Sequence, residues 1–342
     1  MNFVKDLVEE MKDDFTTIAA DEKGSAEFSG FIDTGCYMLN AILSGSLYGG
    51  VPNNKIVALA GASTTGKTFF ALSVLKNFLD ANPENLVVYY DTEAAVTRDM
   101  MDSRGIDTTR VIISEVATLQ QFRTHVIKIL RAYEAKEDRP QMLIVLDSLG
   151  MLSTSKEMED SAAGKETRDM TRAQLVRATF RVLTLHLAKV QVPLILTNHI
   201  YDVVGAQFPT KEIGGGAGLK YAAAIILFLT KKQDKPITRS KETNEILGNI
   251  IAVKTYKSRI ARENAETKLL LTYEHGLDKY FGLLSLAEKY DIIKKVSTQY
   301  MLPDGRRVYG KHINENPEEV FTEEIMEKLQ EAAQKEYLYG QG

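Results

Sequence analysis

Residues 55–79 have the sequence KIVALAGASTTGKTFFALSVLKNFL, and this stretch decides the fold of the chain. Its first apolar run predicts a buried β-strand, and the pattern from Lys67 onward predicts a helix. The segment between them, GASTTGKT at residues 61–68, matches the P-loop pattern. Its glycines let backbone N–H groups turn toward phosphates, and the helix N-terminus adds the positive end of its dipole. The sequence therefore predicts a nucleoside triphosphate site at a strand-to-helix turn.

The P-loop motif assigns roles to individual side chains. Lys67 is expected to reach the β- and γ-phosphates, and the Thr68 hydroxyl is expected to ligate Mg²⁺. The chain has no Asn-Lys-x-Asp motif that would read guanine, so the predicted cofactors are ATP and Mg²⁺. The motif and the residue after it supply the expected nucleotide contacts, namely Gly61, Ala62, Ser63, Thr64, Thr65, Gly66, Lys67, Thr68 and Phe69.

Two further apolar runs end in acidic residues. Residues 142–147, MLIVLD, predict a strand with Asp147 at its end, where a carboxylate can hold Mg²⁺ through water. Residues 86–93, LVVYYDTE, predict another strand, which is followed by Glu93. A carboxylate at this edge of a parallel sheet can orient or deprotonate the attacking water. From the residues alone, a catalytic base and a solvent-exposed glutamate are equally good interpretations of Glu93.

Apolar runs alternate with helical patterns through the middle of the chain. This alternation predicts a mostly parallel sheet with helices on both faces. Residues 199–220 interrupt the rhythm with a Gly triplet and are expected to form a long irregular, functional loop. The predicted strands of the parallel part are 55–61, 86–91, 110–114, 142–147 and 193–198, the helices are 67–79, 119–133 and 169–190, and three later strands at 223–230, 248–256 and 268–273 are expected to extend the sheet in antiparallel fashion.

The two ends of the chain have a different character from the middle. An amphipathic helix is expected from about Asn2 to Asp13, and it can either dock on a neighbouring molecule or fold back on its own chain. Near the C-terminus we expect a helix at 277–290, a hairpin at 300–310 with Pro-Asp-Gly at its turn, and an acidic helix at 316–333. The predicted domains are an arm and linker at 1–29, an ATPase core at 30–275 and a small α/β extension at 276–342.

Composition and charge exclude several classes of protein. The 342 residues include one cysteine, Cys36, so no intramolecular disulfide can form. No apolar run is long enough to span a membrane and no signal-peptide core is present, so we expect a cytoplasmic protein. The net charge of −4 argues against binding nucleic acid by bulk charge. However, residues 211–262 hold eleven Lys or Arg and four Asp or Glu, whereas residues 315–331 hold seven Glu and one Lys.

Five motifs taken in order resemble the RecA family: GASTTGKT, YYDTE, LIVLDS, LILTNH and GGGAGLKYAA. The resemblance covers about residues 30–335 and implies a RecA-like P-loop ATPase core. Within that family, the chain looks most like the UvsX-type strand-exchange proteins of tailed phages. The cues for this nearer likeness are DSLGMLSTSKEMED, the DMTRA helix opening, TNH at the end of its strand and KSR around Ser258.

The resemblance implies further roles at the ATP site. Glu93 lies where the family keeps its water-activating glutamate, and His199 lies where bacterial members keep a glutamine that senses the γ-phosphate. Lys257 and Arg259 match two cations that reach the ATP of a neighbouring subunit and act like an arginine finger. One departure is Met100, which stands where the family often has an aromatic residue to stack on adenine.

Two segments match the DNA-binding loops of the family, at about 153–165 and 200–220. Glycines in the second segment allow backbone N–H groups to approach phosphates closely. The alternative for the arginines that follow the first segment is an ordinary solvated face of a helix. The residues implied to contact DNA are Arg168, Arg172, Arg177, Arg181, Gly214, Gly215, Gly216 and Lys220.

The family implies an ATP-dependent recombinase that forms helical homo-oligomers on single-stranded DNA and hydrolyses ATP at subunit interfaces. Its expected partners are single-stranded DNA, homologous duplex DNA and further copies of the chain. A loading mediator and a single-strand-binding protein are additional candidate partners. The expected processes are strand exchange, repair and recombination-dependent replication. The alternatives are a helicase-type motor of the same fold, a P-loop small-molecule kinase and an ATP-binding regulator without turnover.

Overall fold

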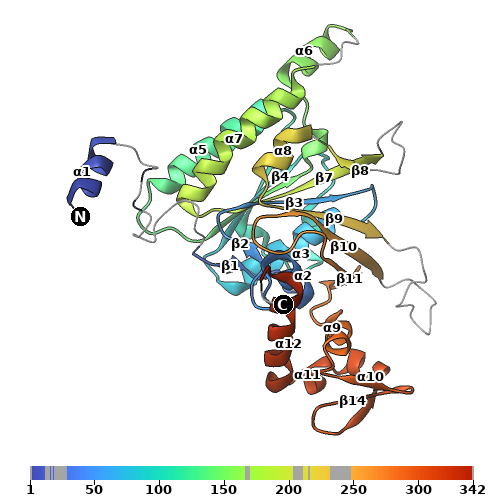
Figure 1. The fold of residues 1–342 in the computed structure, drawn as a ribbon. Helices are drawn as coiled ribbons and strands as arrows, with labels where there is room; N and C mark the ends of the chain where they lie inside the picture. Colours follow the sequence, from blue (N-terminus) through green and yellow to red (C-terminus); the bar gives the residue numbers. More distant parts are fainter. Residues whose placement is uncertain are drawn as a thin grey trace.

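The structure is a computed structural model that describes residues 2–11, 16, 18, 29–165, 170–202, 211–214, 216–231 and 248–340. Its centre is a ten-stranded sheet (Figure 1). The strands next to the P-loop run parallel in the order β3-β7-β6-β4-β5, as the alternating pattern predicts. These strands are β3 (Ile56–Gly61), β4 (Leu86–Asp91), β5 (Val111–Glu115), β6 (Met142–Asp147) and β7 (Leu194–Asp202).

The later strands extend the sheet on the other side of β3. The strand β9 (Ile225–Lys231) lies parallel to β3, which differs from the prediction, because the helix α8 (Gly216–Ala222) carries the chain back to the edge where β3 begins. Beyond it, β10 (Gly248–Ser258), β11 (Glu266–Thr272) and β12 (Gly276–Leu277) follow in antiparallel fashion, as expected for the added strands.

The segment predicted as an irregular loop is partly regular. The strand β7 continues through Asp202, and β8 (Lys211–Ile213) pairs with this extension in antiparallel register. The backbone N–H and C=O groups of residues 200–202 therefore find partners in a short hairpin arm. Residues 203–210 and Gly215 lie outside the described residues.

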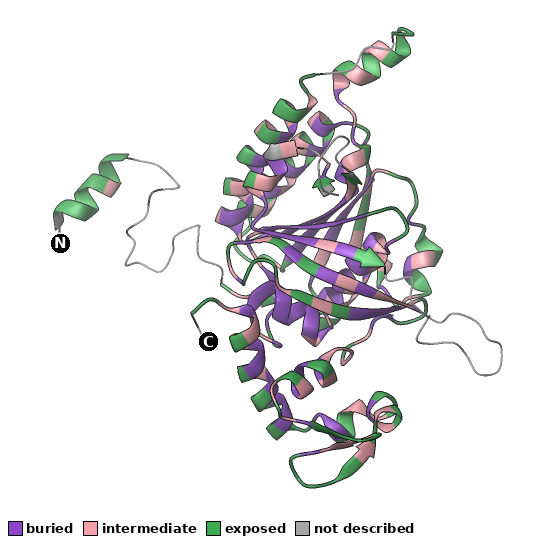
Figure 2. Cartoon of the chain, turned by 45° about the vertical axis from the view of Figure 1, so that its right-hand side comes forward, coloured by how far each residue is buried: buried purple, intermediate pink, exposed green. Residues whose placement is uncertain are grey.

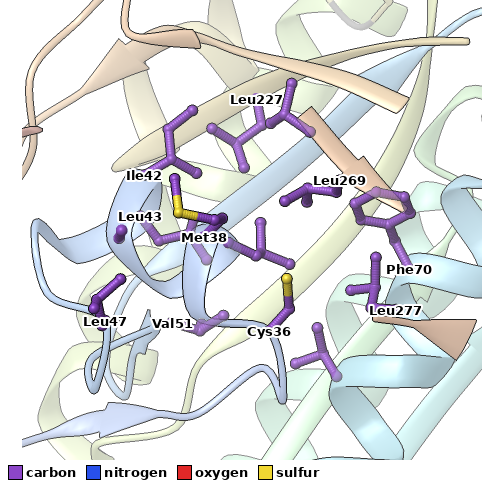
Figure 3. Packing of buried hydrophobic residues seen from close by; sticks show 14 of the residues in the cluster. Cys36, Met38, Ile42, Leu43, Leu47, Val51, Phe70, Leu227, Leu269 and Leu277 are labelled. Atoms are coloured by element: carbon purple, nitrogen blue, oxygen red, sulfur yellow. The ribbon is translucent and has the colours of Figure 1, made fainter. Parts of the chain in front are cut away.

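Helices cover both faces of the sheet and bury two separate apolar clusters. Side chains alternate along each strand, so Val57, Val87 and Val145 face one cluster, while Ala58 and Val88 face the other. The first cluster packs against α2 (Tyr37–Ser44) and α3 (Lys67–Ala81), and Figure 3 shows Cys36, Met38, Ile42 and Phe70 inside it. The second packs against α5 (Leu119–Glu134), α7 (Arg172–Val190) and α8.

Several short elements connect the core. The helix α7 begins at Arg172 and not at Asp169, and residues 166–169 lie outside the described part of the chain. The connecting elements are β1 (Phe31–Ile32), β2 (Val51–Pro52), α4 (Arg98–Asp102), α6 (Ser155–Ala162), and the single 3₁₀ turns at Thr108–Arg110 and Leu149–Met151.

The C-terminal part differs in detail from the pattern-based prediction. The expected hairpin is present as β14 (Gln299–Met301) and β15 (Arg307–Tyr309), and β13 (Lys294–Val296) adds a third strand. The helix predicted at 277–290 is shortened to α9 (Leu283–Lys289), because β12 and a left-handed Gly282 precede it. Before the acidic segment comes α10 (Gly310–Glu315).

The acidic helix predicted at 316–333 is two helices. They are α11 (Pro317–Val320) and α12 (Glu323–Tyr337). The break at Phe321 turns this ring inward, where it is 7% exposed and stacks on Tyr280 with centroids 6.0 Å apart. Burial of an aromatic ring is worth more than one continued helical turn, so tertiary packing overrides the local pattern.

The N-terminal helix α1 (Asn2–Met11) leaves its apolar side chains in solvent. Phe3 is 72% exposed and Met11 is 60% exposed, and Val4 and Leu7 are exposed as well. In Figures 1 and 2 this helix stands away from the sheet and its covering helices. Its apolar face is thus not buried against its own core, which favours the docking interpretation. None of the helices described is long and apolar enough to cross a membrane.

Candidate nucleotide and DNA site

The P-loop joins the carboxyl end of β3 to the start of α3. Gly66 adopts a left-handed conformation with φ of 88°, and a Cβ there would lie 2.6 Å from Cδ2 of Leu271. Glycine is therefore required at this position for both conformation and space. Thr64 is also left-handed with φ of 63°, so the loop curls tightly before the helix begins.

The Lys67 ammonium is folded against the P-loop itself. It donates hydrogen bonds to the carbonyl oxygens of Gly61 and Ala62, at 3.1 and 2.9 Å. Burial lowers the pKa of Lys67, while the negative charges of Asp147 and Glu93 act in the opposite direction. The amine is thus held at the phosphate position by carbonyl groups that a phosphate oxygen can replace.

The predicted nucleotide contacts from Ser63 to Phe69 line one cavity of about 390 Å³, whereas Gly61 and Ala62 are not among its lining residues. Its floor is the P-loop from Ser63 to Phe69, and Glu93, Asp147 and His199 approach from the strand ends. Sheet register explains this meeting, because Gly61 pairs with His199 and Asp91 pairs with Asp147. Residues that sequence reasoning missed form the opposite wall: Lys231, Asn249, Ile251, Leu271, Thr272 and Tyr273.

Glu93 is held by a neighbour on the next strand end. Its Oε1 accepts a hydrogen bond of 2.9 Å from the Ser148 hydroxyl and lies 3.6 Å from Nε2 of His199. Asp91 orders the loop that carries Glu93, since its carboxylate accepts from the backbone N–H groups of Glu93 and Val96. The structure therefore brings Glu93 and His199 together in the cavity and does not leave Glu93 on an unrelated surface.

The Asp147 carboxylate and the Thr68 hydroxyl line the same cavity. Both are oxygen ligands of the kind that Mg²⁺ prefers. Asp147 is 6% exposed, so a cation there would be largely shielded from bulk water. The donor set thus fits an Mg²⁺ ion bound together with a triphosphate.

Met100 does not reach the wall of this cavity. It is half-buried and packs against the core cluster, while its carbonyl oxygen accepts a 2.8 Å hydrogen bond from Arg104. The aromatic side chain on the cavity wall beyond the P-loop is Tyr273, whose hydroxyl accepts from the Asn249 amide at 2.8 Å. The base contact of Met100 that the resemblance implies therefore stays a prediction, and the structure shows this side chain packed against the apolar core cluster.

Comparison with known proteins gives this geometry a context. The model of the RecA N-terminal domain matches residues 11–278. The chain belongs to the RecA family. It is 31% identical over 258 residues to the recombination and repair protein of Enterobacteria phage T4, a match that covers 75% of this chain and 63% of that protein.

Two bacterial relatives match more of their own length. Protein RecA of Deinococcus radiodurans is 28% identical over 311 residues, which cover 88% of this chain and 79% of that protein. Protein RecA of Thermus aquaticus is 26% identical over 293 residues, which cover 84% and 82%. The RecA-family assignment therefore rests on most of the chain and not on the P-loop alone.

The two predicted interface cations of this RecA-family chain lie at the end of α8. The Lys257 ammonium donates to the carbonyl oxygens of Lys220 and Ala223, the latter at 2.8 Å. The Arg259 guanidinium donates to the Tyr221 carbonyl at 2.7 Å. Cations are favourable here because the last carbonyl groups of a helix lack partners within it. Burial, and next the charge of Arg259, lower the pKa of Lys257.

A β-bulge in β10 lies directly before Lys257 and Arg259. Thr255 pairs with Leu227 and Lys257 with Ile226, so Tyr256 is an extra residue in β10. A bulge changes which face the following side chains occupy. The carbonyl contacts of Lys257 and Arg259 described above depend on this change of direction.

The predicted DNA arginines have different environments. The Arg172 guanidinium donates to the carbonyl oxygens of Gly150 and Leu152, at 3.2 and 3.0 Å, so it fastens the start of α7 to the 3₁₀ turn at 149–151. Arg177 and Arg181 are exposed, and Arg177 lies over the Tyr221 ring at 5.8 Å. Within the described residues, Arg181 has no hydrogen-bond or ion-pair partner. Arg172 thus has a structural use that the sequence did not reveal.

The remaining predicted DNA contacts surround β8 and α8. The amide of Asn198 donates to the Gly214 carbonyl at 2.6 Å, and Gly216 begins α8. Lys220 pairs with Glu212 at 3.3 Å, so part of its charge is neutralised. Arg168 and Gly215 lie outside the described residues, and their predicted contacts remain predictions.

The acidic cluster from Glu315 to Glu331 lies in the C-terminal helices α10, α11 and α12. In both views α10 to α12 lie at the end of the molecule opposite α6. The sequence leaves two interpretations of this cluster, competition with DNA for the basic surface and an ordinary solvated helix face, and both stay predictions.

Two of the three arginines of α7, Arg172 and Arg181, allow a direct test of the structural assignment. Arg172→Ala should lower the free energy of unfolding by about 1–3 kcal/mol, because several carbonyl groups lose a charged donor. Arg181→Ala, on the same helix, should change it by less than about 0.5 kcal/mol. Urea denaturation followed by circular dichroism measures both. Equal effects of the two substitutions would show that the carbonyl contacts of Arg172 are not structural.

Proposed function

We propose that the chain is an ATP-dependent recombinase that assembles on single-stranded DNA and promotes pairing and strand exchange with homologous duplex DNA. One observation carries the proposal. The strand β7 holds His199 at the ATP cavity and continues directly into the arm that is predicted to contact DNA. A single rigid strand therefore joins a γ-phosphate sensor to a DNA-binding segment, with no flexible link between them. Family membership supports the ATP-hydrolysing activity.

The residues of the cavity suit phosphoryl transfer to water. Glu93 accepts from Ser148 with one oxygen, which leaves its other oxygen to orient and deprotonate a water molecule. Lys67 neutralises charge on the transferred phosphoryl group. Bound Mg²⁺ supplies further neutralisation of the phosphates, and Thr68 and Asp147 are the residues that would hold it. His199 can donate a hydrogen bond to the γ-phosphate from its imidazole ring.

Assembly into a helical homo-oligomer would complete the site. In a filament, Lys257 and Arg259 would reach the ATP of the adjacent subunit and stabilise charge in the transition state. The exposed apolar face of α1 would dock on a neighbour and so hide the surface that a single chain leaves in water. A loading mediator and a single-strand-binding protein are further partners that a recombinase of this kind would use.

The alternatives explain less of the molecule. A small-molecule kinase needs an arginine-rich lid that closes over a second phosphate. Among the described residues, those that line the cavity include no arginine. A regulator without turnover would have no use for Glu93 held beside His199. A helicase-type motor shares the core, but it does not account for the UvsX-type motifs at 147–160 and 197–199.

The base assignment predicts the behaviour of Glu93→Gln. This variant should bind ATP normally but lose hydrolysis by about 10²–10⁴-fold, because the water loses its proton acceptor. Wild-type hydrolysis should rise when single-stranded DNA is added, and filaments of the variant on DNA should persist longer. Phosphate release with and without single-stranded DNA measures this. Wild-type rates in Glu93→Gln would contradict the assignment.

The DNA assignment predicts the salt dependence of Arg181→Ala. Removing one phosphate contact should weaken binding to single-stranded DNA and lower the slope of log K against log salt by roughly 0.7. Arg131→Ala, at the exposed C-terminal end of α5, is a matched control with the same charge change. Fluorescence anisotropy in a salt series provides the slope. An unchanged slope in Arg181→Ala would place the DNA site elsewhere.

The shared-site assignment predicts complementation between two inactive variants. Lys67→Ala lacks the P-loop charge, and Lys257→Ala/Arg259→Ala lacks the proposed interface cations. Each alone should lose ATPase activity, whereas a mixture should regain part of it, since some interfaces then pair an intact P-loop with intact cations. Electron microscopy should confirm that mixed filaments form. Mixed filaments that remain inactive would count against a site shared between subunits.

A further inference from the structure

The Asp147 carboxylate accepts hydrogen bonds from two buried side chains to which the sequence analysis assigned no role. The Tyr89 hydroxyl donates to Oδ2 of Asp147 at 2.7 Å, and the Thr197 hydroxyl donates to Oδ1. Both Tyr89 and Thr197 are 0% exposed. Each carboxylate oxygen is therefore held by its own donor, and neither donor reaches solvent.

Sheet geometry explains why these three side chains meet. The strand β6, which ends at Asp147, lies between β4 with Tyr89 and β7 with Thr197. Val145 and Ile195, two residues before Asp147 and Thr197, face the cluster that also holds Tyr89 and the helix α3. Because side chains alternate along a strand, all three groups point to the face that carries the P-loop helix.

Two donors, one on each oxygen, restrict the carboxylate. Rotation about the terminal bond of an aspartate is otherwise loosely restrained, since that torsion has a broad two-fold profile. An ionised carboxylate offers about four lone-pair sites, so one donor on each oxygen leaves sites for water molecules around a cation. Tyr89 and Thr197 thus fix the plane of the carboxylate without using up its capacity to accept.

We propose that Tyr89 and Thr197 are positioning residues for Mg²⁺–nucleotide binding, because they hold Asp147 in the orientation that the hydrated ion needs. This inference rests on the proposed ATP and Mg²⁺ site. Partners that orient a metal ligand from behind commonly change metal affinity 10- to 100-fold when removed. Neither side chain touches the cavity itself, so their effect passes through Asp147 alone.

A simpler explanation is that Asp147 only satisfies two hydroxyl groups that are buried for packing. The chain offers matched controls that separate the explanations. Tyr90, the next residue of β4, faces the opposite cluster, and its buried hydroxyl has no hydrogen-bond partner among the residues that the structure describes. Thr179 in α7 is likewise 0% exposed, and within the described part of the chain its hydroxyl has no hydrogen-bond partner either. Removing these hydroxyls changes packing equally but leaves Asp147 alone.

The test is an Mg²⁺ titration of the binding of a slowly hydrolysed ATP analogue, ATPγS, to the full chain without DNA. Tyr89→Phe and Thr197→Val should each raise the Mg²⁺ concentration for half-maximal binding about 10- to 100-fold. Tyr90→Phe, Thr179→Val and the hydroxyl-retaining Thr197→Ser should keep the wild-type midpoint. Analogue binding in EDTA should be the same in all variants, since no ion is then present to be positioned.

These measurements test the roles of Tyr89 and Thr197 without any DNA-dependent readout. Folded Tyr89→Phe and Thr197→Val variants with wild-type Mg²⁺ midpoints would overturn the proposal. If Tyr89→Phe fails to fold, the comparison of Thr197→Val with Thr197→Ser decides alone. An unchanged midpoint in Asp147→Asn would remove the metal assignment and the proposal with it. A lack of stimulation by DNA would instead count against the recombinase function and would leave this proposal standing.

Discussion

Parallel pairing of β3, β7, β6 and β4 is the constraint on which the rest of the molecule depends. Parallel strands end at one edge of the sheet, so the P-loop, His199, Asp147 and Glu93 arrive there together although 138 positions separate Gly61 from His199. The register leaves no freedom to move one of them alone, since a one-residue slip would send every side chain of that strand to the other face. Catalytic geometry is thereby built into the hydrogen bonding of the sheet.

The strand β7 continues beyond the carboxyl edge of the parallel strands, where the cavity lies. The strand β7 runs from His199 at the cavity to Asp202, and its last three residues pair with β8. At the C-terminal end of α8, Lys257 and Arg259 donate hydrogen bonds to the last carbonyl groups. A cation that moved to a neighbour's phosphate would leave those carbonyls unpaired, so the proposed interface contact and the position of α8 are energetically linked.

Basic and acidic residues are concentrated on different elements of the molecule. The exposed arginines of α7 belong to a helix that packs against α8, whereas α11 and α12, which carry most of the acidic cluster, lie at the end of the molecule opposite α6 (Figures 1 and 2). A net charge of −4 is therefore compatible with a local surface for DNA. Repulsion from the acidic end would act on a duplex that approaches there and not on a strand held at α7.

Sequence patterns alone predicted the parallel sheet, the P-loop helix and the places of Lys67 and Asp147, because these signals are local and strand polarity brings strand ends together. The residues left two interpretations of Glu93 open, and the roles of Glu93 and His199 came from the resemblance to the RecA family. Only the tertiary structure decided which side chains face these residues. The hydrogen bonds of Tyr89, Thr197 and Arg172 depend on contacts between distant segments, and so does the place of Tyr273 on the cavity wall. Such contacts are selected by packing and by the need to pair buried polar groups, and neither leaves a periodic signal in the sequence.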